Sequence, residues 1–177
     1  FNDAPYVDTL NPDAIADFIH VTHDAYYKAI GKDFGDTVPA IFTDEPQFPT
    51  KDTLDFALEQ KDVILPWTRR LPDLYQERYG QDILDVLPQL FWELPEGQLS
   101  QARYRFHNLV ADLFASAYTG QIGAWCREHG IALTGHVMGE PTLLSQTQEV
   151  GDAMRCYPSF GIPGIDMLCD FHEYTTA

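Results

Sequence analysis

Residues 39–48 read PAIFTDEPQF, a short apolar run that ends in two acids and a proline. The branched and aromatic side chains of this run favour a buried strand, and Pro46 stops the strand from continuing. Asp44 and Glu45 therefore stand at the carboxyl end of the strand. Because adjacent carboxylates beside an apolar core are costly unless they are solvated, paired or used, we take this pair as a candidate functional site.

The residues on both sides of this strand predict further helices and strands. Asn11 is a typical helix N-cap, Pro12 suits the first helical position, and Gly31 marks the end of that helix. An extended stretch is expected before it, ending at Asp8. The elements expected after the first strand are small helices inserted within 50–96, a long helix over about 98–129, a strand within 131–140, a short helix or irregular connection over 142–155, and a strand within 161–173.

The alternation of strands and helices predicts an α/β fold with a parallel sheet. An open doubly wound sheet and a (β/α)8 TIM-barrel-like fold both fit this order. No phosphate-binding GxGxxG or GxxxxGK[ST] motif follows a strand, and polar residues recur at strand ends, which favours the barrel. A full barrel takes about 250 residues, so we expect residues 1–177 to be a partial barrel domain.

The formal charge is −16, from 27 acidic and 11 basic residues. This balance disfavours nucleic acids and anionic membranes, whose binding depends on Lys and Arg. No apolar run approaches the roughly 20 residues of a membrane-spanning helix, so we expect no membrane insertion. An acidic chain remains compatible with neutral sugars and with divalent cations.

Acidic and histidine side chains recur where the predicted strands end. The residues concerned are Asp8, Asp44, Glu45, His136, Glu140, Asp170, His172 and Glu173. In a barrel these strand ends meet at one face, so residues far apart in the sequence become neighbours. The sequence therefore predicts an acidic pocket at that face.

Glycoside hydrolysis uses two carboxyl groups, one that protonates the leaving oxygen and one that activates water or attacks the sugar. Crowded acids also raise the pKa of at least one member, as a general acid requires. Glu45 and Glu173 would lie two strands apart, roughly 10 Å before converging, with Glu140 on the strand between them. That spacing favours an inverting mechanism over a retaining one.

Six stretches resemble the bacterial α-L-rhamnosidase family of glycoside hydrolases: YVDTLNPDAIADFI, IFTDEPQF, LPDLYQERYG, TGHVMGE, LLSQTQEVGDAMR and IPGIDML. The resemblance implies a barrel catalytic domain within a larger multidomain chain, secreted or periplasmic, with an inverting mechanism and a calcium (Ca2+) requirement. It implies catalytic carboxylates at Glu45, Glu140 and Glu173. We assign the general acid to Glu45, the general base to Glu173, and a place in the sugar or calcium shell to Glu140. TDEP is also similar to the Asn-Glu-Pro motif of a wider glycosidase clan, but Asp44 replaces the Asn, so the retaining mechanism of that clan is not carried over.

The sequence thus predicts a glycoside hydrolase that cleaves a terminal α-L-rhamnosyl or similar bond in a carbohydrate substrate. Asp8, Asp44, His136 and His172 are the candidate substrate-binding residues, and the metal ligands are not assigned. Asp8 could equally cap the nearby helix, Asp44 could orient Glu45, and His136 could be a core histidine. Two other functions stay open: a non-catalytic carbohydrate-binding barrel relative and a metal-dependent hydrolase of another substrate.

Overall fold

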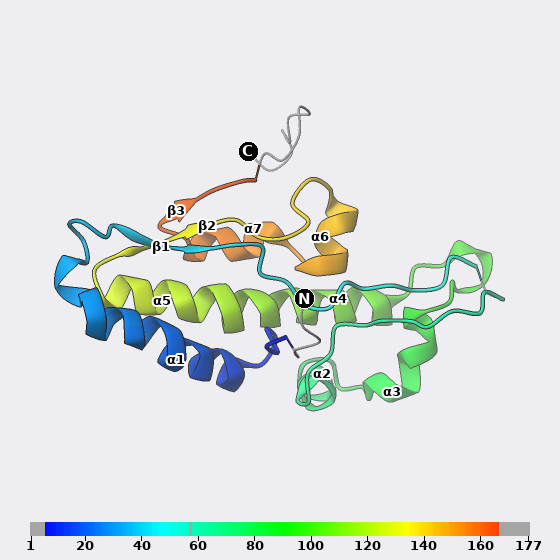
Figure 1. Cartoon of the computed structure of the whole chain (residues 1–177). Helices are drawn as coiled ribbons and strands as arrows, with labels where there is room; N and C mark the ends of the chain where they lie inside the picture. Colours follow the sequence, from blue (N-terminus) through cyan, green and yellow to red (C-terminus); the bar gives the residue numbers. More distant parts are fainter. Residues whose placement is uncertain (1–5, 57, 167–177) are drawn as a thin grey trace.

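The structure, a computed structural model, describes residues 6–56 and 58–166. A parallel sheet lies along one side of a long central helix (Figure 1). Its strands, in the order β1-β2-β3, are β1 (Ala40–Thr43), β2 (Ala132–Gly135) and β3 (Ile162–Pro163). The register pairs Thr43 with Gly135 and Gly135 with Pro163, so the carboxyl ends of the three strands meet at one edge.

Helix α1 (Pro12–Ile30) has the start and end that the sequence predicts. The Asn11 side chain accepts a hydrogen bond from the Asp13 N–H at 3.0 Å, and Pro12 occupies the first helical position. Gly31 follows as the C-cap and opens the 3-10 helix η1 (Gly31–Asp33). Capping by a side-chain oxygen satisfies one of the amide groups that a helix start leaves unpaired.

The long helix predicted over about 98–129 is confirmed as one continuous helical run with a wider turn in its middle. It consists of α4 (Gln101–Phe114), a π-helical segment η4 (Ala115–Gly120) and α5 (Gln121–Glu128). Ser100 caps its start by accepting from the Arg103 N–H at 3.1 Å. The π-helical segment carries Tyr118, whose hydroxyl lies 2.9 Å from Thr43 Oγ1, so this turn contacts the end of β1.

In its described part the insertion within 50–96 contains short helices from residue 71 on, after an irregular stretch with one antiparallel bridge between Asp52 and Ile64, and it adds no strand to the main sheet, as predicted. Its helices are α2 (Leu71–Tyr79), α3 (Ile83–Val86), η2 (Leu87–Leu90) and η3 (Pro95–Gly97). Between β2 and β3 the connection is helical as well. Its elements are α6 (Leu143–Glu149), α7 (Ala153–Cys156) and η5 (Tyr157–Ser159).

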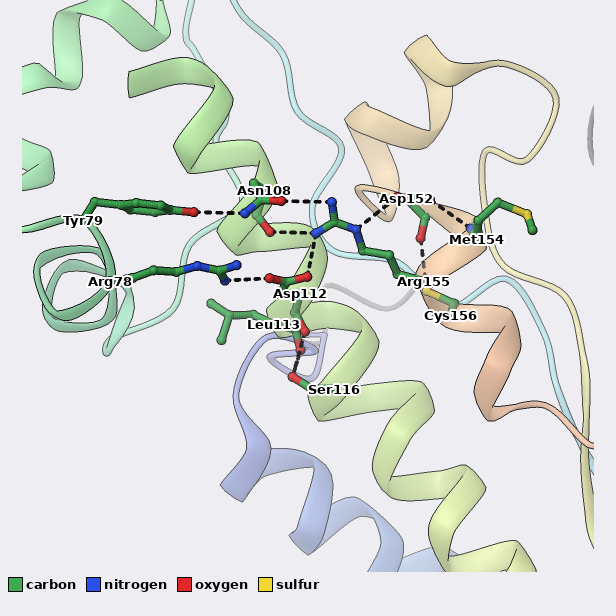
Figure 2. A network of polar contacts seen from close by, with 10 residues as sticks. All are labelled: Arg78, Tyr79, Asn108, Asp112, Leu113, Ser116, Asp152, Met154, Arg155 and Cys156. Carbon is green, nitrogen blue, oxygen red and sulfur yellow. Dashed lines mark hydrogen bonds and ion pairs between the residues drawn. The ribbon is translucent and has the colours of Figure 1, made fainter. Parts of the chain in front are cut away.

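A polar network ties α7 and α2 to the long helix (Figure 2). Arg155 on α7 donates to Asp112 Oδ1 on α4 at 2.5 Å and to Asn108 Oδ1 at 2.9 Å. Arg78 on α2 donates to the other oxygen of Asp112 at 2.6 Å. Charge-assisted hydrogen bonds from two arginines to one carboxylate are stronger than bonds between neutral groups. They hold the connection between β2 and β3 against the long helix.

The segment after β1 is anchored in the core. Phe48 is 1% exposed, and its ring meets the Phe114 ring edge-on at 5.8 Å. The Phe48 N–H donates to the Glu149 carbonyl at 3.0 Å. The loop that carries Glu45 is therefore held at one end by the strand and at the other by a buried aromatic side chain and α6.

The sheet differs from the expectation at one predicted strand, and another predicted strand is described only in part. Residues 6–8 were expected to form a strand, but they lie outside the sheet, because Asp8 begins a turn in which its carboxylate accepts from the Leu10 N–H at 3.1 Å. The strand expected within 161–173 covers Ile162–Pro163 in the part described. Parallel pairing is observed, while closure into a barrel stays a prediction.

No helix in the described part of the chain combines the length and hydropathy that crossing a bilayer demands.

Candidate functional site

Each strand delivers a metal-binding or acidic side chain just beyond its carboxyl end. Glu45 follows β1, His136 follows β2, and Asp166 follows β3. Backbone hydrogen bonds keep these three segments together beyond the regular strands. The His136 N–H donates to the Thr43 carbonyl at 3.3 Å, and the Gly164 N–H donates to the Gly135 carbonyl at 2.9 Å.

Gly135 allows the close approach of β1 and β2 at this edge. Its φ is 121°, and a Cβ placed there would lie 1.9 Å from the Thr43 carbonyl oxygen. Any side chain would thus collide with the backbone of β1 in a conformation that favours glycine. The position of His136 beside the end of β1 depends on this glycine.

The backbone of Glu45 is in the left-handed region, with φ of 46°. This conformation is uncommon for residues other than glycine and is typical of turns and functional sites. The turn separates the exposed side chain of Asp44 from the half-buried side chain of Glu45. Glu45 thereby faces a cavity, which Asp44 does not line.

The cavity has a volume of about 200 Å3 and lies beyond the carboxyl ends of the strands. Four carboxylates line it: Glu45, Glu140, Glu149 and Asp166. The remaining lining residues are Val137, Met138, Gly139 and Pro141. Two of the four acids, Glu45 and Glu140, are predicted site residues, whereas Glu149 and Asp166 were not among them.

Glu140 is 2% exposed, and both of its carboxylate oxygens accept hydrogen bonds. The Tyr157 hydroxyl and the Val137 N–H, at 3.4 Å, donate to Oε1, and the Asp166 N–H donates to Oε2 at 3.2 Å. Burial and the neighbouring Glu140 raise the pKa of Tyr157, which keeps its hydroxyl a donor. The carboxylate of Glu140 therefore holds the segments after β2 and β3 together.

Glu149 lies at the end of α6 and faces the same cavity. Burial raises the pKa of Glu149, and the negative charge of Glu45 raises it further. Both causes favour the protonated acid because they destabilise its charged form. The surroundings of Glu149 thus favour its carrying a proton.

His136 is buried, and its ring meets the Phe42 ring edge-on at 5.6 Å. Its Nε2 lies 3.2 Å from Asp44 Oδ1 and 3.6 Å from Asp166 Oδ2. Neither contact has hydrogen-bond geometry, so this buried nitrogen has no hydrogen-bond partner among the described residues. One ligand atom each from Glu45, His136 and Asp166 lies within 4.8 Å of the other two.

The structure brings Asp44, Glu45, His136 and Glu140 together, as the sequence predicts. Asp8 lies apart from the cavity lining. Its carboxylate accepts from the Thr68 hydroxyl at 2.7 Å and from the Leu10 N–H at 3.1 Å, so it stabilises the turn before α1, whose N-cap is Asn11.

The predicted residues Asp170, His172 and Glu173 lie outside the described part of the chain. Asp166 was missed because it falls inside the strand predicted within 161–173, whereas the observed β3 ends at Pro163. Glu149, within a short polar helix, carries no strand-end signal.

The calcium that the family resemblance implies can be tested against the ligand group. Calcium is a hard cation that takes six to eight oxygen ligands. The group of Glu45, His136 and Asp166 supplies two carboxylates and one imidazole nitrogen. This donor set does not fit calcium.

Comparison with known proteins gives one solved structure with a similar fold. It is a rhamnosidase from Novosphingobium sp. PP1Y, with a TM-score of 0.58 and 20% sequence identity over 90% of this chain. The chain spans only 14% of the length of that rhamnosidase. A scan of protein-family models and a search of curated proteins found no match. At this identity the likeness concerns the fold.

Proposed function

We propose that this chain is part of the catalytic domain of a glycoside hydrolase that cleaves terminal α-L-rhamnosyl or similar bonds. The observation that carries the proposal is the convergence of Glu45, Glu140, Glu149 and Asp166 on one cavity at the carboxyl ends of parallel strands. This is where barrel enzymes place their active sites. The fold likeness to part of a rhamnosidase supports the same reading.

The acid and base roles follow from the surroundings of the carboxyl groups. Glu149 suits the proton donor because its burial and the charge of Glu45 favour its protonated form. We therefore propose Glu149 as the general acid in place of Glu45, to which the sequence-based assignment gave that role; both residues line the cavity. Glu140 positions the loops through its hydrogen bonds, and Glu173 remains the proposed base from outside the described residues.

The wider expectations stay part of the proposal. These are a carbohydrate substrate, an inverting mechanism, a larger multidomain chain that carries the remaining strands of the barrel, and a secreted or periplasmic location. Of these, the stereochemistry is directly measurable, because NMR of the first-released sugar distinguishes inversion from retention.

The test is hydrolysis of aryl α-L-rhamnosides by the protein in its natural length. We expect Glu149→Gln to lower turnover at least about 100-fold, since general acid catalysis contributes about that much or more. The loss should be largest for poor leaving groups, which need the proton most. Glu77→Gln, an exposed glutamate on α2, is the matched control and should keep the wild-type rate.

A full rate in Glu149→Gln with every leaving group would defeat the assignment of the donor. Sugar binding by calorimetry without any released product would instead support the carbohydrate-binding alternative and end the proposal of an enzyme.

A further inference from the structure

We propose that Glu45, His136 and Asp166 bind a divalent first-row transition-metal ion, such as zinc or manganese, in place of calcium. The inference concerns metal binding alone and does not depend on glycoside hydrolysis. It starts from the topology of the sheet, because each of the three adjacent strands contributes one ligand at the same edge. Backbone hydrogen bonds between the strand ends hold the three ligands in place.

The distances in the group fit one ion after small side-chain rotations. Carboxylate oxygens and imidazole nitrogens bind zinc at about 2.0–2.2 Å, which places ligand atoms on one ion roughly 3–4 Å from each other. The ligand atoms of Glu45, His136 and Asp166 already lie within 4.8 Å of one another. His136 Nε2 and Asp166 Oδ2, at 3.6 Å, already have the separation of two ligands of a single ion.

His136 is the independent observation that points to a ligand. Its side chain is 10% exposed, and its Nε2 faces Asp44 and Asp166 without making a hydrogen bond. A buried polar atom without a partner typically costs about 1–3 kcal/mol. A cation between the imidazole and the carboxylates would satisfy this nitrogen and neutralise the acids around it.

The donor set selects the class of ion. Imidazole with carboxylates suits zinc, iron, manganese and their neighbours, whereas calcium takes oxygen ligands. Three protein ligands also leave coordination positions open for water or for a substrate hydroxyl, as in catalytic rather than structural zinc sites. Glu45 and Asp166 both line the cavity, so these positions would face it.

Glu45 and Asp166 are the residues that this site shares with the cavity of the proposed hydrolase. A bound cation would weaken the repulsion between Glu45 and Glu149, but burial is the larger cause of the raised pKa of Glu149 and would persist. The two proposals are therefore compatible, and a direct measurement of metal binding separates them.

The experiment is a titration with Co2+ of the natural-length protein after treatment with a chelator. Bound cobalt absorbs visible light, so the spectrum reports binding and coordination without any assay of activity. We expect saturation at one ion per chain, displacement by an equal amount of Zn2+, and no displacement by millimolar Ca2+. Failure of glycoside hydrolysis would leave this result unaffected.

Single substitutions locate the ion. His136→Gln and Asp166→Asn should each weaken cobalt binding at least about 100-fold, since even changes to residues outside the ligand set cost about 10–100-fold. His107→Gln, a histidine paired with Lys51 instead, and Asp36→Asn, an exposed acid, are the matched controls and should bind as the wild type does. Circular dichroism checks that each variant is folded.

Three results would overturn the inference. They are wild-type affinity in a folded Asp166→Asn variant, displacement of cobalt by millimolar calcium, and the absence of saturable cobalt binding.

Discussion

The hydrogen bond from Tyr157 to Glu140 offers a direct test of how the cavity is built. Tyr157→Phe removes the hydroxyl and keeps the ring, which packs 5.5 Å from the Phe160 ring. Glu140 then keeps the backbone donors of Val137 and Asp166, at 3.4 and 3.2 Å, but loses its side-chain donor. The change thus removes a hydroxyl that donates to a carboxylate that is 2% exposed and that also meets the Val137 backbone.

Hydrogen bonds to charged groups contribute about 1.5–3 kcal/mol, and burial prevents water from replacing the lost donor. We therefore expect Tyr157→Phe to lower the free energy of unfolding by about 2 kcal/mol. Urea unfolding at pH 7, monitored by circular dichroism, measures this difference. It appears as a lower urea concentration at the midpoint, with an unchanged dependence of the unfolding free energy on urea. Tyr104→Phe, at a tyrosine that is 71% exposed, is the matched control and should change stability by less than about 0.5 kcal/mol.

A double-mutant cycle with Glu140→Gln identifies the partner. If the hydroxyl acts through Glu140, the two substitutions together should cost less than the sum of their separate effects. Strict additivity, or a cost of Tyr157→Phe no larger than that of the Tyr104 control, would refute the view that this contact holds the cavity together.

Three further changes test the fold and its electrostatics. Burial and the nearby charge of Lys51 lower the pKa of His107 to about 4. Between about pH 6.5 and pH 4 the unfolded chain therefore binds a proton at His107 that the folded chain does not. The free energy of unfolding should fall by up to about 3 kcal/mol as the pH drops through this range. His107→Gln should remove this part of the acid sensitivity, which urea midpoints at pH 7 and 4.5 would reveal as a smaller drop than in the wild type. Gly135→Ala should cost several kcal/mol or prevent folding, because its Cβ would collide with the Thr43 carbonyl; an unchanged melting temperature would contradict the observed strand spacing. Asn11→Ala should lower stability by about 1 kcal/mol through loss of the helix cap, and equal stability of the two proteins in thermal unfolding would argue against that cap.

The helices could be predicted because their signals are local. Asn11 is the N-cap of α1 and Pro12 is its first residue, so both signals stand next to the turn that they predict. The apolar spacing of the long helix repeats with each turn. The strand before Asp44 is equally clear, since Pro46 ends it. Where a turn competes with an extended conformation, the prediction fails. Asp8 follows residues expected to form a strand, but its carboxylate stabilises a turn with the Leu10 N–H.

The sequence by itself determined that acids and His136 stand at the ends of strands, because strand ends are local features. It did not determine which of these side chains share a cavity. Glu149 faces Glu45 only because Phe48 anchors the intervening loop to α6, and Asp166 reaches His136 only because β3 pairs with β2 in one register. Contacts of this kind join residues about 30 to 104 positions apart, so they depend on packing and strand register, which tertiary structure alone decides.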